Sequence, residues 1–149
     1  MAYQYKESGL DNVFLENGFT VHQTPYGEGV SIANTSDLHA IIGGWLVSLP
    51  KRLVGAELRF LRLEMELTQR DLAGLLGQEE QALRRWEKAR TRTINGSADL
   101  LLRALYNEYV GGDGTVRRMV DRLAELNVVE FPRAVLREID DHWSLAQTC

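Results

Sequence analysis

Apolar residues near the middle of the chain recur at helical spacing on either side of a glycine. These residues are Leu72, Leu76, Leu83 and Trp86. The first two lie four positions apart and the last two lie three apart, so each pair marks one face of a helix. Gly77 falls between the pairs, where a sharp corner needs a residue that tolerates positive φ. The pattern predicts two short helices, at 69–76 and 79–88, joined by a tight turn.

The residues around this pair of helices support the same interpretation. Thr68 is of a type that caps helix N-termini, and Asp71 suits the positive end of the helix dipole. Ala73 is small where the second helix is expected to cross the first, and a larger side chain would push the two apart. We therefore expect a helix-turn-helix, a unit that places its second helix in the major groove of DNA.

Helical periodicity continues on both sides of this unit. Further helices are predicted at 36–48 (capped by Ser36 or Asp37), 55–67, 97–109 (capped by Ser97), 116–126 and 132–143. In the helix at 97–109 the inward positions are Leu100, Leu101, Ala104 and Leu105. Gly43 and Gly44 each weaken their helix by about 1 kcal/mol relative to alanine, and close approach of another segment would explain them.

The start of the chain favours β-structure. Val13–Glu16 and Phe19–Gln23 flank Asn17-Gly18, a strong signal for a two-residue hairpin turn. Pro25–Gly29 then breaks the run before a short third strand at Val30–Ile32. Two or three short strands are not stable alone, so we expect them to pack on the helices or on a second subunit.

The expected fold is mostly α with a small N-terminal unit, a β-hairpin or three strands. Residues 1–35 form this unit, and residues 36–110 form a linking helix and a five-helix domain that contains the helix-turn-helix. Residues 111–149, beyond the glycines at 111–114, form a C-terminal helical extension and a candidate dimerisation element. Packing of that extension on the chain's own core is an equal alternative. A length of 149 residues, 44% of them hydrophobic, suits one domain with appendages.

The net charge of −4 argues against a protein that coats nucleic acid without selectivity. Its distribution is uneven, because residues 1–50 carry one Lys and five acidic residues, whereas 51–103 carry eleven Lys or Arg and eight acidic residues. Five cations and one anion lie within Arg84–Arg92. This basic island favours one local phosphate footprint, with a solvated helix face as the alternative.

Motifs for catalysis or metal binding are missing from the sequence. The three histidines, His22, His39 and His142, have no ligand spacing, and the single cysteine is Cys149. The glycines at 111–114 lack the lysine of a phosphate-binding loop. We therefore expect no enzymatic activity, no cofactor and no metal. Apolar runs fall short of the ~20 residues that span a bilayer and the start lacks a signal-peptide pattern, so we expect a cytoplasmic protein without membrane contact.

The second helix of the pair carries side chains suited to reading DNA. Gln81 and Arg85 lie four positions apart and project from one face. Glutamine suits the N6/N7 edge of adenine and arginine the O6/N7 edge of guanine, each bidentate pair contributing ~1–3 kcal/mol of discrimination. Glu80 would repel phosphates unless it accepts from a cytosine amino group. Phosphate contacts are expected from Thr68, Gln69, Arg84, Lys88 and Arg90.

Residues 55–105 resemble the Xre/Cro-type repressor domain. The matching positions are Thr68-Gln69, Leu72-Ala73, Gly77 and Trp86-Glu87. The resemblance implies base contacts from Glu80, Gln81 and Arg85, and a phosphate contact from Gln69. It also implies a structural ion pair between Arg62 and Glu87.

Two positions depart from the pattern of that family. Gln78 stands where the residue after the corner is usually apolar, which would loosen the turn. Ala89 stands where the second helix usually ends on a glycine, which would let that helix continue into Arg90. Both departures affect how the second helix is presented to a ligand.

The order of a small β-unit, a linking helix and an Xre-type domain is similar to antitoxins of the MqsA type. That family binds zinc through pairs of cysteines that this sequence lacks, so zinc is not expected. The prediction is a dimeric, sequence-specific repressor of double-stranded DNA, autoregulatory, with a cognate toxin as a further partner. The alternative, favoured by the acidic first fifty residues and by Glu79-Glu80, is a protein-interaction module or toxin neutraliser that does not itself bind DNA.

Overall fold

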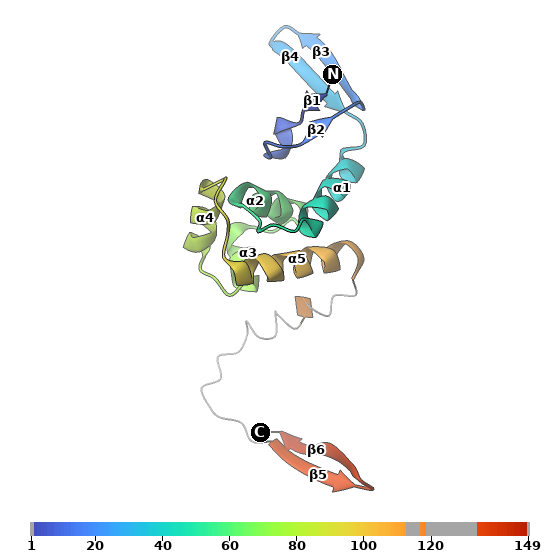
Figure 1. The fold of residues 1–149 in the computed structure, drawn as a ribbon, viewed down its shortest axis with the longest axis vertical. Helices are drawn as coiled ribbons and strands as arrows, with labels where there is room; N and C mark the ends of the chain where they lie inside the picture. Colours follow the sequence, from blue (N-terminus) through green and yellow to red (C-terminus); the bar gives the residue numbers. More distant parts are fainter. Residues whose placement is uncertain (1, 113–116, 119–133, 149) are drawn as a thin grey trace.

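Five α-helices and three antiparallel strand pairs make up the part of the chain that the computed structural model describes, residues 2–112, 117–118 and 134–148 (Figure 1). The helices are α1 (Thr35–Ser48), α2 (Gly55–Glu64), α3 (Gln69–Leu75), α4 (Glu80–Lys88) and α5 (Gly96–Gly111). The strands are β1 (Tyr3–Gln4), β2 (Phe14–Leu15), β3 (Phe19–Thr24), β4 (Gly27–Ile32), β5 (Ala134–Ile139) and β6 (His142–Thr148), and a 3-10 helix η1 spans Lys6–Ser8. The described part is about half helical with small antiparallel strand pairs, which is consistent with the predicted class of mostly α with a small β-unit. The helix expected at 116–126 lies outside the described residues except at 117–118.

One hydrophobic core joins all five helices to the N-terminal strands. Leucines without exposed surface come from every helix: Leu46, Leu58, Leu61, Leu72, Leu83 and Leu102. The same core includes Tyr5, Leu10, Val13 and Leu15. Burial of apolar surface is the dominant favourable term in folding. The N-terminal β-unit therefore packs on the helices of its own chain, one of the two expected arrangements.

A polar contact also attaches the N-terminal unit to α1 and α2. The Tyr5 hydroxyl hydrogen-bonds to His39 Nε2 at 2.7 Å, and His39 Nδ1 lies 2.5 Å from Glu64 Oε1. The imidazole packs against Phe60, with 5.4 Å between ring centroids. Burial, together with the carboxylates of Glu7 and Glu64, raises the pKa of Tyr5, so its phenol stays protonated. His39 has a structural role in this contact.

The first residue of α1 is Thr35, and the cap is Asn34 instead of Ser36 or Asp37. Asn34 has a φ of 42°, and its side chain accepts a hydrogen bond from Asp37 N at 3.3 Å. Asparagine adopts this left-handed backbone more readily than serine does, so the cap lies two residues earlier than the first polar candidate. Asp37 falls in the first turn, where its charge suits the helix dipole.

The two adjacent glycines of α1 have opposite surroundings. A Cβ built on Gly43 would lie 1.9 Å from the hydroxyl oxygen and 2.4 Å from Cζ of Tyr106 in α5. A Cβ built on Gly44 would meet nothing within 4 Å. The close approach expected from the sequence is therefore confirmed for Gly43 only.

We expect Gly43→Ala to lower the free energy of unfolding by about 1–3 kcal/mol, because overpacking forces α1 and α5 apart. Tyr106 is buried and cannot swing into solvent without leaving the core. Gly44→Ala in the same helix is the matched control, and it should be neutral or stabilise by up to about 1 kcal/mol. Urea unfolding followed by circular dichroism measures both. Equal effects of the two substitutions would contradict the close packing.

Strand pairing near the N-terminus differs from the predicted hairpin at Asn17-Gly18. β2 pairs with β1, whereas β3 pairs with β4. Gly18 has the positive φ of 79° that a turn uses, but the chain on its two sides joins different partners. The tight turn lies at Pro25-Tyr26, where Thr24 Oγ1 donates to Gly27 O at 2.6 Å. The turn at Pro25-Tyr26 allows six residue pairs between β3 and β4, and this pairing prevails over the hairpin that Asn17-Gly18 favours locally. The registers place Tyr3 opposite Leu15 and Phe19 opposite Ile32.

Residues 134–148 form a hairpin, so the helix predicted at 132–143 is wrong. The turn residues Asp140 and Asp141 have φ values of 51° and 66°, the left-handed pair typical of a two-residue hairpin turn. The apolar positions of this segment are three or four apart and fit a helix. They are also Val, Leu, Ile and Trp, types of which most favour strands, and the turn selects the hairpin.

The inward face of α5 differs in part from the predicted one. Leu105 is buried and Leu101 packs partly buried against the core, as predicted. Leu100 is 73% exposed and Ala104 is exposed, whereas the buried apolar residues are Ala98, Leu102, Leu105 and Tyr106. Leucines run continuously at 100–102, so periodicity alone fits more than one face. Contact between Tyr106 and Gly43 selects the observed face. The cap is Asn95 instead of Ser97, and its side chain accepts from Ser97 N at 2.9 Å.

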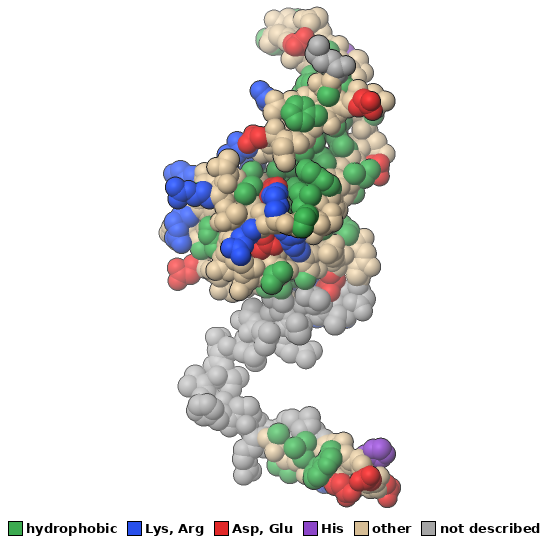
Figure 2. Space-filling view, viewed as in Figure 1, with side chains coloured by type: hydrophobic (Ala, Val, Ile, Leu, Met, Phe, Trp, Pro, Cys, Tyr) green, Lys and Arg blue, Asp and Glu red, His purple; other side chains and the backbone are tan. Residues whose placement is uncertain are grey.

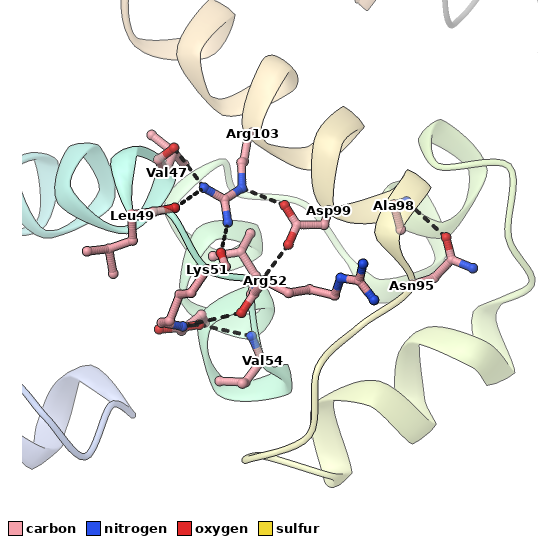
Figure 3. Close-up of polar contacts among 11 residues, drawn as sticks. Val47, Leu49, Lys51, Arg52, Val54, Asn95, Ala98, Asp99 and Arg103 are labelled. Atoms are coloured by element: carbon pink, nitrogen blue, oxygen red, sulfur yellow. Dashed lines mark hydrogen bonds and ion pairs between the residues drawn. The ribbon is translucent and has the colours of Figure 1, made fainter.

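An arginine and an aspartate of α5 hold the segment between α1 and α2 in place (Figure 3). Arg103 donates to three backbone carbonyl oxygens, those of Val47, Leu49 and Lys51. Its Nε lies 2.5 Å from Asp99 Oδ1, and Asp99 Oδ2 accepts from Leu53 N at 2.6 Å. These polar groups satisfy one another's hydrogen bonds, so the segment between α1 and α2 is held in one position although it has no regular secondary structure. Its position determines where α2 begins.

Candidate nucleic-acid interface

A corner of four residues joins α3 to α4. Gly77 has a φ of 67°, and Gln78 N donates to Ala73 O at 2.8 Å across the corner. Ala73 is 2% exposed, and Leu72 and Leu83 have no exposed surface. The predicted positive φ and the predicted small buried residue are both confirmed. The turn is closed by a hydrogen bond even though the residue after the corner is polar.

Thr68 caps α3 as predicted. Its Oγ1 accepts from Asp71 N at 3.0 Å, and Asp71 Oδ2 accepts in return from Thr68 N at 3.4 Å. This reciprocal pair satisfies two backbone donors at the start of the helix. Thr68 is exposed, and its hydroxyl is already engaged in the cap.

Arg62 of α2 and Glu87 of α4 form the expected buried ion pair. Arg62 Nε and Nη2 donate to the two carboxylate oxygens at 2.7 and 2.9 Å. Gln69 Nε2 of α3 donates to the same carboxylate at 3.2 Å, and Arg62 Nη1 donates to Leu67 O at 2.9 Å. One carboxylate thus connects three helices. Gln69, predicted to contact phosphate, is half-buried and uses its amide nitrogen within this network.

The outer face of α4 carries polar side chains that contact no partner in the described part of the chain. Gln81, Arg85 and Lys88 are exposed, and their side chains have no hydrogen bond or ion pair with another residue that the structure describes. The opposite side of α4 faces the core, where Leu83 and Glu87 are buried. Lys and Arg side chains gather on the surface over α4 (Figure 2). Gln81 and Arg85, four positions apart, are therefore presented together.

Glu80 and Arg84, at the start of α4, pair with each other. Arg84 Nη2 lies 2.7 Å from Glu80 Oε1, and the side chains are 38% and 56% exposed for Glu80 and Arg84. An exposed pair at this spacing contributes about 0.3–0.5 kcal/mol, so an incoming ligand can separate it at little cost. The arginine also offsets the negative charge that the sequence placed near the expected phosphates.

The last residue of α4 is Lys88, with Ala89 as its C-cap, so the helix does not continue into Arg90. Backbone N–H groups at the start of α2 donate to Arg90 O and Arg92 O at 3.0 and 3.1 Å. These bonds turn the chain back over α2 and end α4 without a glycine. The expected extension is therefore wrong.

Arg90 connects the end of α4 to the N-terminal unit. Its Nη2 donates to Gly9 O at 2.7 Å and lies 3.2 Å from Asp11 Oδ1. The Arg90 side chain is 50% exposed, so solvent reaches it although it is held. The sequence predicts a phosphate contact for Arg90 but not its pairing with Asp11, because 79 positions separate the two residues.

Two cations that no sequence pattern indicates as ligand contacts lie beside Arg90. Lys6 of η1 and Arg59 of α2 line a cleft of about 420 Å³ together with Arg90. They are far apart in the sequence and share no spacing pattern, so only the packing of the N-terminal unit on α2 brings them together. Of these two cations, only Lys6 stands out in the sequence, because it is the single Lys or Arg in residues 1–50.

Other kinds of site find little support in the described ranges. No group of three or more His, Cys, Asp or Glu there is arranged to hold a metal ion. Within the same ranges, no helix combines the length and the apolar character needed to cross a membrane. A cleft of about 870 Å³ lies beside the start of α5, but its Asp99 and Arg103 are engaged in the contacts of Figure 3.

No protein-family model, curated protein or solved structure matches the chain. The geometry of α3 and α4 and the charged residues around them are therefore the features of the molecule that indicate a function.

Proposed function

We propose that the protein is a sequence-specific, double-stranded-DNA-binding transcriptional regulator in which α3 and α4 act as an Xre-type helix-turn-helix. The observation that carries the proposal is the outer face of α4. The side chains of Gln81 and Arg85 are exposed there without a partner among the described residues, while the other side of the helix is anchored in the core by Leu83. A rigid helix with a free polar face is the form of element that enters a major groove.

The chemistry of that face suits base edges. Arg85 would bind guanine O6 and N7 in bidentate fashion, and Gln81 would bind adenine N6 and N7. Both face no competing partner in the described part of the chain, so binding DNA breaks no internal contact of theirs. Glu80, tied to Arg84, would accept from a cytosine amino group after that exposed pair opens.

Phosphate contacts would surround this reading face. Lys88 is exposed without an internal partner among the described residues, whereas Arg84 and Arg90 are each about half exposed. Thr68 and Gln69 lie at the start of α3, where Gln69 also holds Glu87. Such contacts orient the protein on the duplex and carry no sequence information themselves.

A regulator of this size would act as a homodimer. One such domain reaches few base pairs, and useful affinity calls for two copies on half-sites about one helical turn apart. The C-terminal part of the chain, which includes the β5–β6 hairpin, is the dimerisation element that we propose. Repression of its own gene in the cytoplasm, as the antitoxin of a toxin–antitoxin pair, is the biological role consistent with this arrangement.

A band-shift experiment with the DNA upstream of the protein's own gene, at two salt concentrations, tests the proposal. We expect a shift that survives the higher salt better than binding to random DNA does, because base contacts add to the salt-sensitive phosphate term. Equal, weak and salt-sensitive binding to both duplexes, or none, would favour the alternative of a protein-interaction module. That alternative draws on the five acidic residues of positions 1–50, which suit a basic partner such as a toxin.

Arg85→Ala should abolish the preference for the operator and leave weak, salt-sensitive binding to any duplex. The expected loss is ~1–3 kcal/mol of discrimination, since the guanine contact is removed and the phosphate contacts stay. Arg84→Ala, one position away on α4, is the control: it should lower affinity for operator and random DNA alike. Competition titrations of labelled operator measure both ratios. Equal losses on operator and random DNA for Arg85→Ala would contradict its role in base reading.

A further inference from the structure

The cleft beside Arg90 lies where the N-terminal unit meets α2 and the end of α4. Three cations from three separate segments line it: Lys6, Arg59 and Arg90. Gly9 forms part of the wall, and a Cβ added to it would lie 3.6 Å from Arg59 Nη1. Ala56, at the start of α2, is 8% exposed and forms another part. The three charges therefore lie around one opening between the N-terminal unit, α2 and the end of α4.

The carboxylates of the cleft offset only part of this charge. Glu87 is already paired with Arg62, and it lies 3.9 Å from Arg59 Nε. Asp11 lies 3.2 Å from Arg90. The Lys6 side chain is exposed and has no hydrogen bond or ion pair in the described part of the chain. Within the described residues the Lys6 side chain meets no carboxylate, so the opening keeps a surplus of positive charge.

The position of Lys6 is informative because the N-terminal unit is otherwise acidic. Residues 1–50 contain five Asp or Glu and this single Lys. An acidic segment beside a DNA-binding helix would repel the duplex and lower its affinity. The single Lys of residues 1–50 lies at the cleft next to α4, where its positive charge would attract the phosphates of a duplex bound there.

We propose that this cleft binds a phosphate group of the DNA backbone, outside the base pairs that α4 would read. The inference rests on the proposed function and extends it to the N-terminal unit. The guanidinium groups of Arg59 and Arg90 would donate hydrogen bonds to the phosphate oxygens, and Lys6 would add a compact charge. Asp11 opposes binding, because it competes with the phosphate for Arg90.

Affinity of the full chain for two duplexes tests the proposal. The long duplex extends the operator by about one helical turn, roughly ten base pairs, on each side, and the short one stops at its ends. We expect Lys6→Gln and Arg59→Gln each to weaken binding to the long duplex roughly three- to tenfold and to reduce the salt slope by about 1. Binding to the short duplex and the preference for operator over random DNA should stay unchanged.

Opposite charge changes sharpen the test. Asp11→Asn should strengthen binding to the long duplex, because it removes the competing carboxylate. Glu16→Gln removes one negative charge from the same unit outside the cleft, and Arg52→Gln removes one exposed cation from the segment between α1 and α2, also outside the cleft. Both are matched controls that should change affinity by less than about twofold, since screened charges at a distance act weakly.

The outcomes separate this inference from the proposed function. Wild-type preference for the operator together with unchanged affinity of Lys6→Gln and Arg59→Gln would overturn the phosphate cleft alone. Failure of the wild type to bind any duplex would overturn both. A titration with inorganic phosphate, followed by amide shifts of Gly9 in nuclear magnetic resonance, checks for a free phosphate ligand. Saturation there, with DNA affinity unaffected by the variants, would overturn the backbone contact.

Discussion

Glu87→Ala should lower the free energy of unfolding by about 3–5 kcal/mol, the cost of leaving one member of a buried ion pair without its partner. Arg62 is 9% exposed and would keep only its bond to Leu67 O. Gln69 would also lose its acceptor, so the contact among α2, α3 and α4 would weaken at three points. Urea unfolding followed by the fluorescence of the chain's tryptophans measures the change.

Two controls define what that loss means. Glu80→Ala removes a glutamate from the same helix, but its partner Arg84 is exposed, so we expect less than about 0.5 kcal/mol. The double variant Arg62→Met, Glu87→Leu removes both charges, and it should cost clearly less than the sum of the single changes. Equal losses for Glu87→Ala and Glu80→Ala would show that the buried pair does not hold the helices together.

Gly55→Ala should lower the free energy of unfolding by about 3 kcal/mol or more, at the upper end of what overpacking costs. A Cβ at this position would lie 1.8 Å from Trp86 O and 2.8 Å from Ala89 O. These are backbone atoms of α4 and its C-cap, so no rotamer change relieves the overlap. The end of α4 would have to move away from α2, and operator binding should fall along with stability.

Gly74→Ala is the matched control for Gly55→Ala. Gly74 lies in α3, it is exposed, and an added Cβ would meet nothing within 4 Å. Alanine there should be neutral or stabilise by up to about 1 kcal/mol, because it favours the helix. Thermal unfolding of the two variants side by side gives the comparison. A Gly55→Ala protein as stable as Gly74→Ala would mean that α2 and α4 are not in the close contact described.

The α3–α4 corner could be predicted because its information is local. Spacing of three and four residues places Leu72 and Leu83 on inward faces, and both have no exposed surface. Gly77 takes the positive φ that a tight corner demands. Exposure of Gln81 and Arg85 follows from the same periodicity, since they lie on the side of the helix away from Leu83.

Strand pairing could not be predicted in the same way, because a strand is completed by a partner elsewhere in the chain. Asn17-Gly18 is a turn signal, yet β2 and β3 bind different partners on its two sides. At 134–148, the apolar spacing fits a helix whereas most of the apolar residue types favour strands, and the left-handed turn at Asp140-Asp141 accompanies the strand form. The spacing of apolar residues along a short stretch therefore determines neither the partner of a strand nor the choice between helix and strand.

The amino-acid order alone was enough to determine the helical pair, its corner glycine and the polar face of α4, because each depends on residues within four positions of one another. Three-dimensional packing decided everything that joins distant segments. It set the inward face of α5 through Gly43 and Tyr106, and it placed Arg90 against Asp11 across 79 positions. It also gathered Lys6, Arg59 and Arg90 around one cleft. Such contacts depend on which surfaces bury each other, and no short stretch of sequence contains both surfaces.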